Sequence, residues 1–336
     1  MKLFGKDLSR EIAVVAEIGV NHEGDVENAS KLVTLAAQSG ADAVKFQTFT
    51  PERYASATDP ARLERVTGFS LNAEENRRLA REAKEQGIEF FSTPVSEDVI
   101  PLLDELCSAF KIASGDLTFE PVIRAAASRG KPVVMSTGLG TIDEIDQAVG
   151  WVEDEVGSEN LNDRLVLMHC VSAYPTPMEE ANVKSVPFLA ARYGITVGYS
   201  NHVIGPEACL AAVALGARVL EIHFTDQKTG REFRDHALSM EIDDLKLVID
   251  MAGKIDASLG RYGKTPMPSE IENKLAVRKG VVAAQDLGAG TVLTRDDLMY
   301  ARPATEFTAD QLPELVGRTL ANAVKLGELI ARNNVS

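Results

Sequence analysis

Residues 195–235 read ITVGYSNHVIGPEACLAAVALGARVLEIHFTDQKTGREFRD and contain two short apolar runs, 195–199 and 218–224. The segment between the runs is rich in Ala and Leu, which are good helix formers. A strand–helix–strand unit of this kind places its two strands side by side and parallel. His202 and His223 follow these strands, so we expect them at the same end of neighbouring strands, close enough to share one metal ion.

The same alternation of strand-like and helical segments runs back to the start of the chain. Six further apolar runs have strand character, at residues 12–19, 41–48, 89–93, 109–114, 131–137 and 164–172. Helical patterns occupy residues 26–39, 70–86, 97–106, 120–129, 142–156, 205–216 and 243–259. Eight strands that alternate with helices in about 260 residues predict a (β/α)8 TIM barrel. An open doubly wound sheet is the alternative, but no GxGxxG motif follows the first strand.

Polar residues follow each predicted strand, at the end where such barrels carry their active sites. In chain order they are Glu17, Asn21 and His22, then Lys45 and Gln47, Thr93, Lys111, Ser114 and Asp116, Ser136 and Thr137, and His169, Ser172 and Tyr174, before the two histidines. Because all eight strand ends contribute, the sequence predicts one site on this face.

Residues after the barrel change in character. Residues 261–275 contain Pro and Gly with little periodicity and predict a linker. Residues 276–336 hold short strand-like segments around DLGAGT and predict a small β-rich domain. We therefore divide the chain into a barrel of residues 1–260, this linker and the C-terminal domain.

Composition excludes several classes of function. The net charge is −15 and no basic run occurs, which argues against nucleic-acid binding. No apolar stretch reaches the length of a membrane span. The three cysteines lie far apart in apolar runs, which indicates free thiols in a reducing compartment and hence the cytoplasm.

The pairing of His202 with His223 predicts a metal site. Two imidazoles with carboxylate or water ligands form an open site without thiolate, which favours Mn²⁺, with Mg²⁺ or Co²⁺ as alternatives and Zn²⁺ not excluded. A lone histidine at a strand end would more often be an ordinary hydrogen-bonding group. We expect His22 and His169 to orient their neighbours, and we interpret His236 as a surface residue.

Lys45 and Lys111 lie inside apolar strands, where an ammonium group needs an anionic partner. Groups that could hold phosphate oxygens follow nearby strands, at Ser114, Ser136, Thr137 and Gly138. Internal pairing with Glu17 or Asp116 is the alternative. Because two lysines and three hydroxyls exceed what those carboxylates need, we infer an anionic substrate that carries phosphate.

Two acidic residues are candidates for chemistry at the same face. Glu17 follows the first strand and could act as a general acid or base. Asp235 follows the last strand and could bind the metal, its water or a sugar hydroxyl, with an exposed loop acid as the alternative.

Motifs along nearly the whole chain resemble the sialic acid synthase family. They are AEIGVNHEGD at 16–25, GADAVKFQTF at 40–49, KIASGD at 111–116, STGLGTIDEI at 136–145, HCVSAYPTP at 169–177, GYSNH at 198–202 and EIHFT at 221–225. The stretch KGVVAAQDLGAGTVLTRDDLMYARP at 279–303 resembles the SAF, or antifreeze-like, domain that follows the barrel in this family.

The resemblance implies a reaction that the residues alone do not supply. Phosphoenolpyruvate would condense with the open-chain aldehyde of an N-acetylated hexose, giving a nine-carbon 2-keto sugar acid and phosphate. His202 and His223 would hold the metal that polarises the aldehyde. Glu17 would activate water and manage protons at the tetrahedral intermediate.

The resemblance also implies roles for substrate-binding residues. Those for the carboxylate and enol of phosphoenolpyruvate are Lys45, Gln47 and Thr93, and those for its phosphate are Lys111, Ser114 and Ser136. Those for the acceptor sugar are Asp116, Tyr174 and Asp235, and Ser200 is a further substrate-binding residue. Arg302 would reach from the tail into the barrel of a partner subunit, which implies a domain-swapped homodimer.

The sequence departs from the family pattern around the metal and the sugar. Asn201 replaces Asp, Ser172 replaces Asn, Ile222 replaces Lys, and residues 233–236 (FRDH) replace a Gly-Pro-Asp-His turn. The acceptor therefore stays open between N-acetylmannosamine, a diacetamido-dideoxy hexose that leads to legionaminic or pseudaminic acid, and a less common sugar. A metal-dependent barrel hydrolase or aldolase would leave the lysines without purpose. A non-catalytic sugar-binding homologue would not need acid, lysines and histidines together.

Overall fold

A computed structural model of the chain describes residues 1–231, 233 and 235–336. The chain divides into two compact units, Met1–Gly260 and Arg261–Ser336. Each unit has a hydrophobic core of its own.

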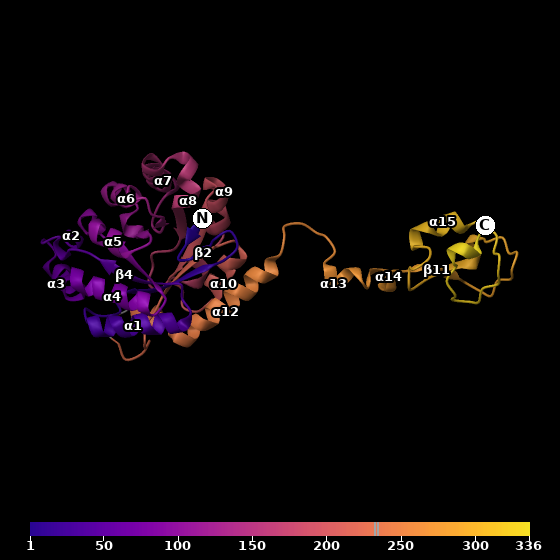
Figure 1. Cartoon of the computed structure of the whole chain (residues 1–336), viewed down its shortest axis with the longest axis horizontal. Helices are drawn as coiled ribbons and strands as arrows, with labels where there is room; N and C mark the ends of the chain where they lie inside the picture. The colour runs from indigo at the N-terminus through magenta and orange to yellow at the C-terminus, as the bar shows by residue number, and fades with distance from the viewer. Residues whose placement is uncertain (232, 234) are drawn as a thin grey trace. The chain divides into compact units, whose positions relative to one another are not determined.

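The first unit is a (β/α)8 barrel, as the alternation in the sequence predicts (Figure 1). Its parallel strands follow one another around the sheet in chain order, and β10 returns to pair with β3. Strands β5 and β6 lie against each other at the remaining seam. The strands are β3 (Ala13–Gly19), β4 (Ala43–Thr48), β5 (Glu89–Pro94), β6 (Phe110–Ile112), β7 (Val133–Ser136), β8 (Leu165–His169), β9 (Thr196–Asn201) and β10 (Val219–His223). Because the first and last strands pair, an open doubly wound sheet is excluded.

One main helix follows each strand and covers the outside of the sheet (Figure 1). These helices are α1 (Val26–Ser39), α4 (Ala73–Glu85), α5 (Ile100–Leu106), α6 (Glu120–Ala127), α7 (Ile142–Val156), α9 (Ser185–Tyr193), α10 (Glu207–Ala214) and α12 (Ile242–Leu259). Shorter helices in the connections are α2 (Pro51–Tyr54), α3 (Pro60–Phe69), α8 (Leu161–Arg164) and α11 (Asp235–Leu238). Local signals set several boundaries: Asn72 and Glu75 form a capping box at α4, and Gly40 ends α1 with a φ of 86°.

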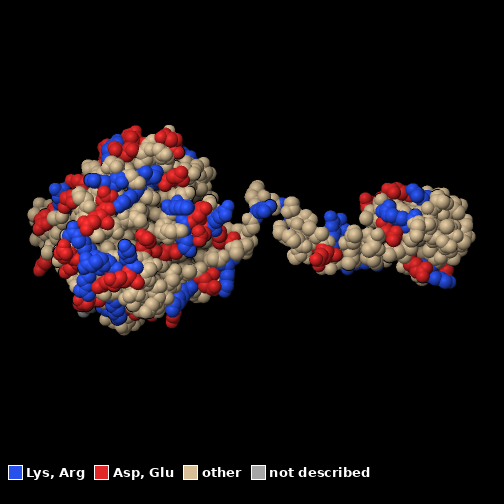
Figure 2. Space-filling model, viewed as in Figure 1, with Lys and Arg blue, Asp and Glu red and all other residues tan. Residues whose placement is uncertain are grey.

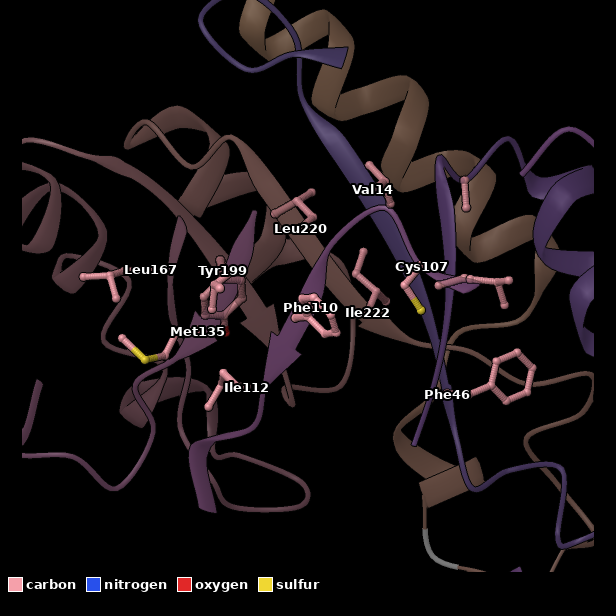
Figure 3. Close-up of a cluster of buried hydrophobic side chains, with 14 of the residues drawn as sticks. Val14, Phe46, Cys107, Phe110, Ile112, Met135, Leu167, Tyr199, Leu220 and Ile222 are labelled. Atoms are coloured by element: carbon pink, nitrogen blue, oxygen red, sulfur yellow. The ribbon is translucent and has the colours of Figure 1, made fainter. Parts of the chain in front are cut away.

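Successive side chains of each strand alternate between the helical layer and the barrel interior. In β3, Val14, Ala16 and Ile18 belong to the outer cluster, whereas Ala13 and Val15 belong to the inner one. Figure 3 shows part of the outer cluster, to which β6, β7, β8 and β10 also contribute. The same alternation decides which polar residues reach the interior.

A hairpin that the sequence pattern does not predict fills the amino end of the barrel. It consists of β1 (Lys2–Leu3) and β2 (Lys6–Asp7) and turns through Phe4 and Gly5, which have φ values of 49° and 78°. Leu3, Phe4 and Leu8 pack with the inner cluster, and the rings of Phe4 and Phe91 lie 4.9 Å apart. The barrel interior is therefore closed at this end.

The second unit is small and β-rich, as predicted. Strands β11 (Gly280–Ala283) and β12 (Leu298–Ala301) pair antiparallel, and further single bridges join the surrounding loops. Its helices are α13 (Pro268–Ile271), α14 (Lys274–Val277) and α15 (Leu312–Leu315). Residues 261–275, which we predicted as an irregular linker, therefore contain one helical turn and the start of another.

Acidic and basic side chains are interspersed over the face seen in Figure 2. Many arginines on the barrel helices pair with carboxylates, as Arg78 does with Glu27 and Arg192 does with Asp146. Within the described residues, no helix is both long and apolar enough to span a membrane.

Candidate active site

The carboxyl ends of the barrel strands open into a cavity of 780 Å³, which is within the range for small-molecule sites. Most of the predicted site residues line it: Glu17, Lys45, Gln47, Thr93, Lys111, Ser114, Ser136, Tyr174, Ser200, His202, His223 and Asp235. Asp116 and Arg302 are not among the lining residues.

Strand register brings these side chains together. Glu17 lies opposite Lys45 of β4 on one side and His223 of β10 on the other, and Gln47 lies opposite Thr93 of β5. Each occupies the interior-facing position of its strand, because the pleat repeats every two residues. Residues that are distant in sequence therefore become neighbours around the carboxyl end of the barrel.

A buried cluster of two lysines and two glutamates forms the floor of the cavity. The Lys45 Nζ lies 3.0 Å from Glu17 Oε2 and 3.5 Å from Glu221 Oε2, and the Lys111 Nζ lies 4.0 Å from Glu221 Oε1. The Ser200 hydroxyl donates to Glu221 at 3.1 Å. All four charged residues are no more than 6% exposed.

Glu221 is a residue of the cavity floor that we did not predict, although it stands in the EIHFT motif. The signal is its spacing: Val219, Glu221 and His223 alternate inward as Ala13, Val15 and Glu17 do. Glu221 also corrects our premise that the lysines outnumber the carboxylates available to them. Two buried carboxylates face the two lysines, so the internal ion pairing that we considered as the alternative is present.

The surroundings of the two carboxyl groups shift their pKa values in opposite directions. Burial raises the pKa of Glu17 to about 7, although Lys45 opposes the shift. Burial also disfavours ionised Glu221, but Lys111 and Lys45 outweigh it and lower the pKa of Glu221 to about 2. Glu17 is thus the member of the cluster that can exchange a proton near neutral pH.

Hydroxyl groups extend the lysine end of the floor. Lys111 Nζ donates to Ser136 Oγ at 2.6 Å, and Lys45 Nζ donates to Thr93 Oγ1 at 3.1 Å. The Gly138 N–H donates to Ser114 Oγ at 3.1 Å, and a Cβ at Gly138 would lie only 2.7 Å from that oxygen. Only glycine therefore lets this loop approach Ser114 closely, and its N–H already has a partner there.

His202 and His223 converge on one side of the cavity, with ring centroids 5.3 Å apart. The Nδ1 of His202 lies 2.6 Å from the carbonyl oxygen of Val171, so when Nδ1 is protonated Nε2 keeps its lone pair. Burial lowers the pKa of both imidazoles, and His202 further lowers that of His223, which keeps them neutral. The ring of Tyr174 lies 4.2 Å from that of His202.

The donor set fits an open divalent-metal site. The Nδ1 of His223 is buried and has no hydrogen-bond partner among the described residues. Groups of three or more potential ligands do not occur in the described part of the chain, so two imidazoles are what the protein would supply. Water and substrate oxygens would complete the coordination.

The mouth of the cavity comes from a segment without a predicted structure, residues 51–69. Helices α2 and α3, with the N-cap residue of α3, add the lining residues Tyr54, Asp59, Arg62, Arg65, Val66 and Phe69. Phe233, from the opposite connection, stacks edge-on against Phe69 at 5.1 Å and lines the cavity as well.

Three of the departures from the family pattern lie away from the cavity. The Asn201 amide bonds to Val203 within its own turn. Ile222 faces the helices in the outer cluster, and Ser172 lines a neighbouring groove. Of the FRDH residues, Phe233 and Asp235 line the cavity, and Arg234 lies outside the described residues.

Other predicted residues have different surroundings from those expected. Asp116 lies in the 3-10 helix η2 (Ser114–Asp116), because β6 ends at Ile112. The interpretation of His236 as a surface residue is wrong: it is fully buried, and its Nδ1 lies 2.7 Å from the Thr225 hydroxyl. The Nε2 of His169 lies 2.9 Å from the Ala181 carbonyl oxygen, and the Nδ1 of His22 accepts from Gly24. Arg302 belongs to the second unit.

Comparison with known families gives two matches. Residues 32–264 match the NeuB family, and residues 278–336 match the SAF domain. Together they span most of both units.

Individual relatives are similar over most of their length. The N,N'-diacetyllegionaminic acid synthase of Campylobacter jejuni is 35% identical, over 96% of this chain and 99% of that protein. The N-acetylneuraminate-9-phosphate synthase of Homo sapiens is 32% identical, over 85% of this chain and 81% of that protein. The crystal structure of the N-acetylneuraminic acid synthetase of Leptospira borgpetersenii is 30% identical, covers 79% of this chain and 90% of its own, and has a TM-score of 0.74.

Proposed function

Because the chain belongs to the NeuB family, we propose that it condenses phosphoenolpyruvate with an N-acetylated hexosamine. The products would be a nine-carbon 2-keto sugar acid and phosphate. The observation that carries this proposal is a single cavity that combines a buried Glu17–Lys45–Glu221–Lys111 cluster with a pair of neutral histidines. The relatives above, which are named as synthases of such acids, support it.

Phosphoenolpyruvate would lie on the floor of the cavity. Lys111, Ser114 and Ser136 would hold its phosphate, and Lys45, Gln47 and Thr93 would meet its carboxylate and enol. The floor carries as many buried acids as lysines, so an anion needs compensation. A proton on Glu17, whose pKa burial raises to about 7, would provide it.

The reaction would form a bond between C3 of phosphoenolpyruvate and the aldehyde carbon of the acceptor. The aldehyde oxygen gains a proton, water adds to C2, and phosphate then leaves with the bridging oxygen. Glu17 would move the protons because it lies between the lysine end and the histidines. A divalent cation on His202 and His223, Mn²⁺ by our expectation, would act as a Lewis acid toward the aldehyde.

The acceptor would occupy the space between the histidines and the mouth, where Tyr174 and Asp235 line the cavity. Ser200 lies beside Glu221 at the floor, so it would act on the cluster and on phosphoenolpyruvate more than on the sugar. Asp116 does not line the cavity, and its contact with the acceptor stays a prediction.

The test is incubation of the protein with phosphoenolpyruvate, Mn²⁺ and a panel of N-acetylhexosamines. We expect sugar-dependent phosphate release and a product whose mass equals acceptor plus the pyruvyl unit. Chelation of the metal should stop turnover, and Lys111→Met or His223→Ala should lower kcat/KM at least 1000-fold, roughly the loss expected for a group that acts in the transition state. Lys246→Met, at an exposed position on α12, is the matched control. Phosphate release that does not depend on any of the sugars would refute the proposal.

A further inference from the structure

Cys170 differs from the other two cysteines of the chain in its surroundings. Cys107 and Cys209 pack in the outer apolar cluster, whereas Cys170 belongs to none of the apolar clusters of the described residues. Cys170 follows strand β8 and lines the cavity, and only 4% of it is exposed. A buried free cysteine usually behaves as a small apolar residue. Its place among polar groups therefore points to a use of its S–H group.

The Cys170 thiol contacts the hydroxyl group of Ser114. Its Sγ lies 3.1 Å from Ser114 Oγ, and the same oxygen accepts from the Gly138 N–H at 3.1 Å. The groups meet at the α-carbon of Gly138, where a Cβ would lie 2.7 Å from Ser114 Oγ and 2.9 Å from Cys170 Sγ. Glycine at position 138 therefore allows the thiol, the hydroxyl and the backbone amide to approach one another closely.

Strand β8 holds both sides of this contact in place. Thr137, the residue before Gly138, bonds to the Met168 carbonyl oxygen through its N–H at 3.0 Å and through its hydroxyl at 3.1 Å. Met168 lies two residues before Cys170, so the loop after β7 is tied to the strand that carries the thiol. Serine and cysteine each have a single side-chain torsion before their polar atom, which keeps the contact well defined.

Hydrogen-bond capacity decides where the Ser114 proton points. A hydroxyl group has one O–H to donate and two lone pairs that accept. The Gly138 N–H occupies one lone pair, and the Cys170 S–H, a weak donor, can occupy the other. Without a ligand the Ser114 O–H can donate to Cys170 Sγ instead. An acceptor in the cavity, which Ser114 lines, selects the arrangement in which the O–H points into the cavity.

We propose that Cys170 is a positioning residue that directs the Ser114 hydroxyl proton toward the phosphate group of phosphoenolpyruvate. This inference rests on the proposed function, in which Ser114 holds that phosphate with Lys111 and Ser136. An anionic acceptor strengthens the hydrogen bond that it receives, and two donors on Ser114 Oγ polarise the hydroxyl in the same direction. The thiol therefore acts through Ser114 and does not need to touch the substrate.

Binding of phosphoenolpyruvate without an acceptor sugar tests this role apart from turnover. Because a neutral hydrogen bond contributes a factor on the order of 5 in affinity, Cys170→Ala should raise the Kd for phosphoenolpyruvate about 5-fold in calorimetric titration. Cys170→Ser supplies an O–H donor at the same place and should return the Kd close to the natural value. Cys107→Ala is the control, because it removes a thiol that is also 4% exposed but lies in the outer apolar cluster.

A double-mutant cycle shows whether the thiol acts through Ser114. Ser114→Ala removes the hydroxyl, so adding Cys170→Ala to it should weaken binding no further. In steady-state kinetics, Cys170→Ala should raise the KM for phosphoenolpyruvate and leave kcat largely unchanged. Four outcomes would overturn the proposal: additive losses in the cycle, an unchanged Kd in Cys170→Ala, a loss confined to kcat, or a Cys170→Ser variant that binds as weakly as Cys170→Ala.

Inorganic phosphate is a second probe that separates failure of this role from failure of the proposed function. If phosphoenolpyruvate does not bind the natural chain, the proposed function fails. A loss of phosphate affinity in Cys170→Ala that disappears in the Ser114→Ala background would still support the role of the thiol. Equal phosphate titrations of the natural chain and Cys170→Ala would refute it.

Discussion

Glu221 balances the charges beneath the cavity. Its carboxylate lies within 4.0 Å of both Lys45 and Lys111, and it accepts from Ser200. A buried ammonium without a counter-charge is costly, and removing one partner of a buried pair destabilises more than the pair itself contributes. Glu221 thus allows two lysines to remain buried while the site is open.

Replacing this carboxylate should make stability depend on an added anion. We expect Glu221→Gln to lower the free energy of unfolding by about 3 kcal/mol, because two ammonium groups then face Glu17 alone. Phosphoenolpyruvate should raise the melting temperature more in this variant than in the natural chain, because its charge replaces the missing one. Glu179→Gln, at an exposed position, serves as the control in the same melting experiment. If phosphoenolpyruvate raised the melting temperature equally in Glu221→Gln and in the natural chain, Glu221 would not be the counter-charge that the anion replaces.

Asp116 allows a test by pH. Burial raises the pKa of Asp116 from 3.8 to about 6, so the folded protein holds this proton more tightly than the unfolded chain does. Its ionisation therefore costs stability as the pH rises from about 4 to 6, and the cost is constant above that range. Asp116→Asn should stabilise the protein by about 1–2 kcal/mol at pH 8, less than the full shift implies because the carboxyl group is partly solvated. Urea unfolding between pH 5 and pH 8 should show the advantage shrinking toward acid, and a pH-independent difference would rule this out.

At the scale of elements, the N-terminal hairpin determines how the barrel interior is filled. The hairpin itself has few backbone hydrogen bonds, so its side chains must hold it in place. Phe4 is the largest of them and packs edge-on against Phe91 of β5. The inner cluster would otherwise face water at the amino ends of the strands.

Truncation of Phe4 should therefore destabilise the whole barrel. We expect Phe4→Ala to lower the free energy of unfolding by about 3 kcal/mol, because it leaves a cavity between the hairpin and β5. Phe188→Ala removes the same ring from an exposed position, where 51% of the residue is accessible, and should cost less than about 0.5 kcal/mol. Denaturant titration compares the two variants. Similar losses would mean that the hairpin does not support the barrel.

The elements that the sequence predicts are those with strong periodicity. The apolar runs of the strands and the amphipathic pattern of α7 are sustained over enough residues to be read directly. Helix α3 has one buried residue, Val66, and therefore no apolar pattern, and the hairpin strands are only two residues long. Helix α3 and the hairpin are stabilised by packing against the folded barrel. A local sequence pattern carries no information about that surface.

The same limit applies to the site. Residues at the strand ends, such as Lys45 and His223, were predicted because position along a strand reveals the face on which they lie. Glu221 lies two residues before His223 on β10, deeper in the barrel. Its pairing with the lysines becomes apparent only when the closed barrel brings the strands together. Asp116 was expected in the cavity, but it lies at the end of η2 and does not line the cavity, whereas Ser114 at the start of η2 does.

At the scale of the whole molecule, the open question is what the second unit does for the first. Our expectation, from the family resemblance, is that Arg302 acts in the barrel of a partner subunit. Arg302→Ala should then raise the KM for the acceptor, and gel filtration should show a dimer.

Mixed subunits test whether Arg302 acts between chains. A chain with Arg302→Ala keeps its histidines, and a chain with His223→Ala keeps its arginine. If the arginine acts in the partner, refolding the two together should restore activity, because a hybrid dimer contains one complete site. Each variant refolded alone is the control, and no recovery in the mixture would place the action of Arg302 within its own chain or outside the site.

The N-terminal hairpin also limits how ligands can enter and leave the cavity. Because Leu3, Phe4 and Leu8 fill the amino end of the barrel, a ligand enters and leaves through the mouth at the carboxyl ends of the strands. A molecule on Lys111 lies behind any molecule beside Tyr174, since Lys111 is 2% exposed and Tyr174 is 38% exposed. Under the proposed function, the ligand at the lysine end must therefore bind before the ligand beside Tyr174 and leave after it.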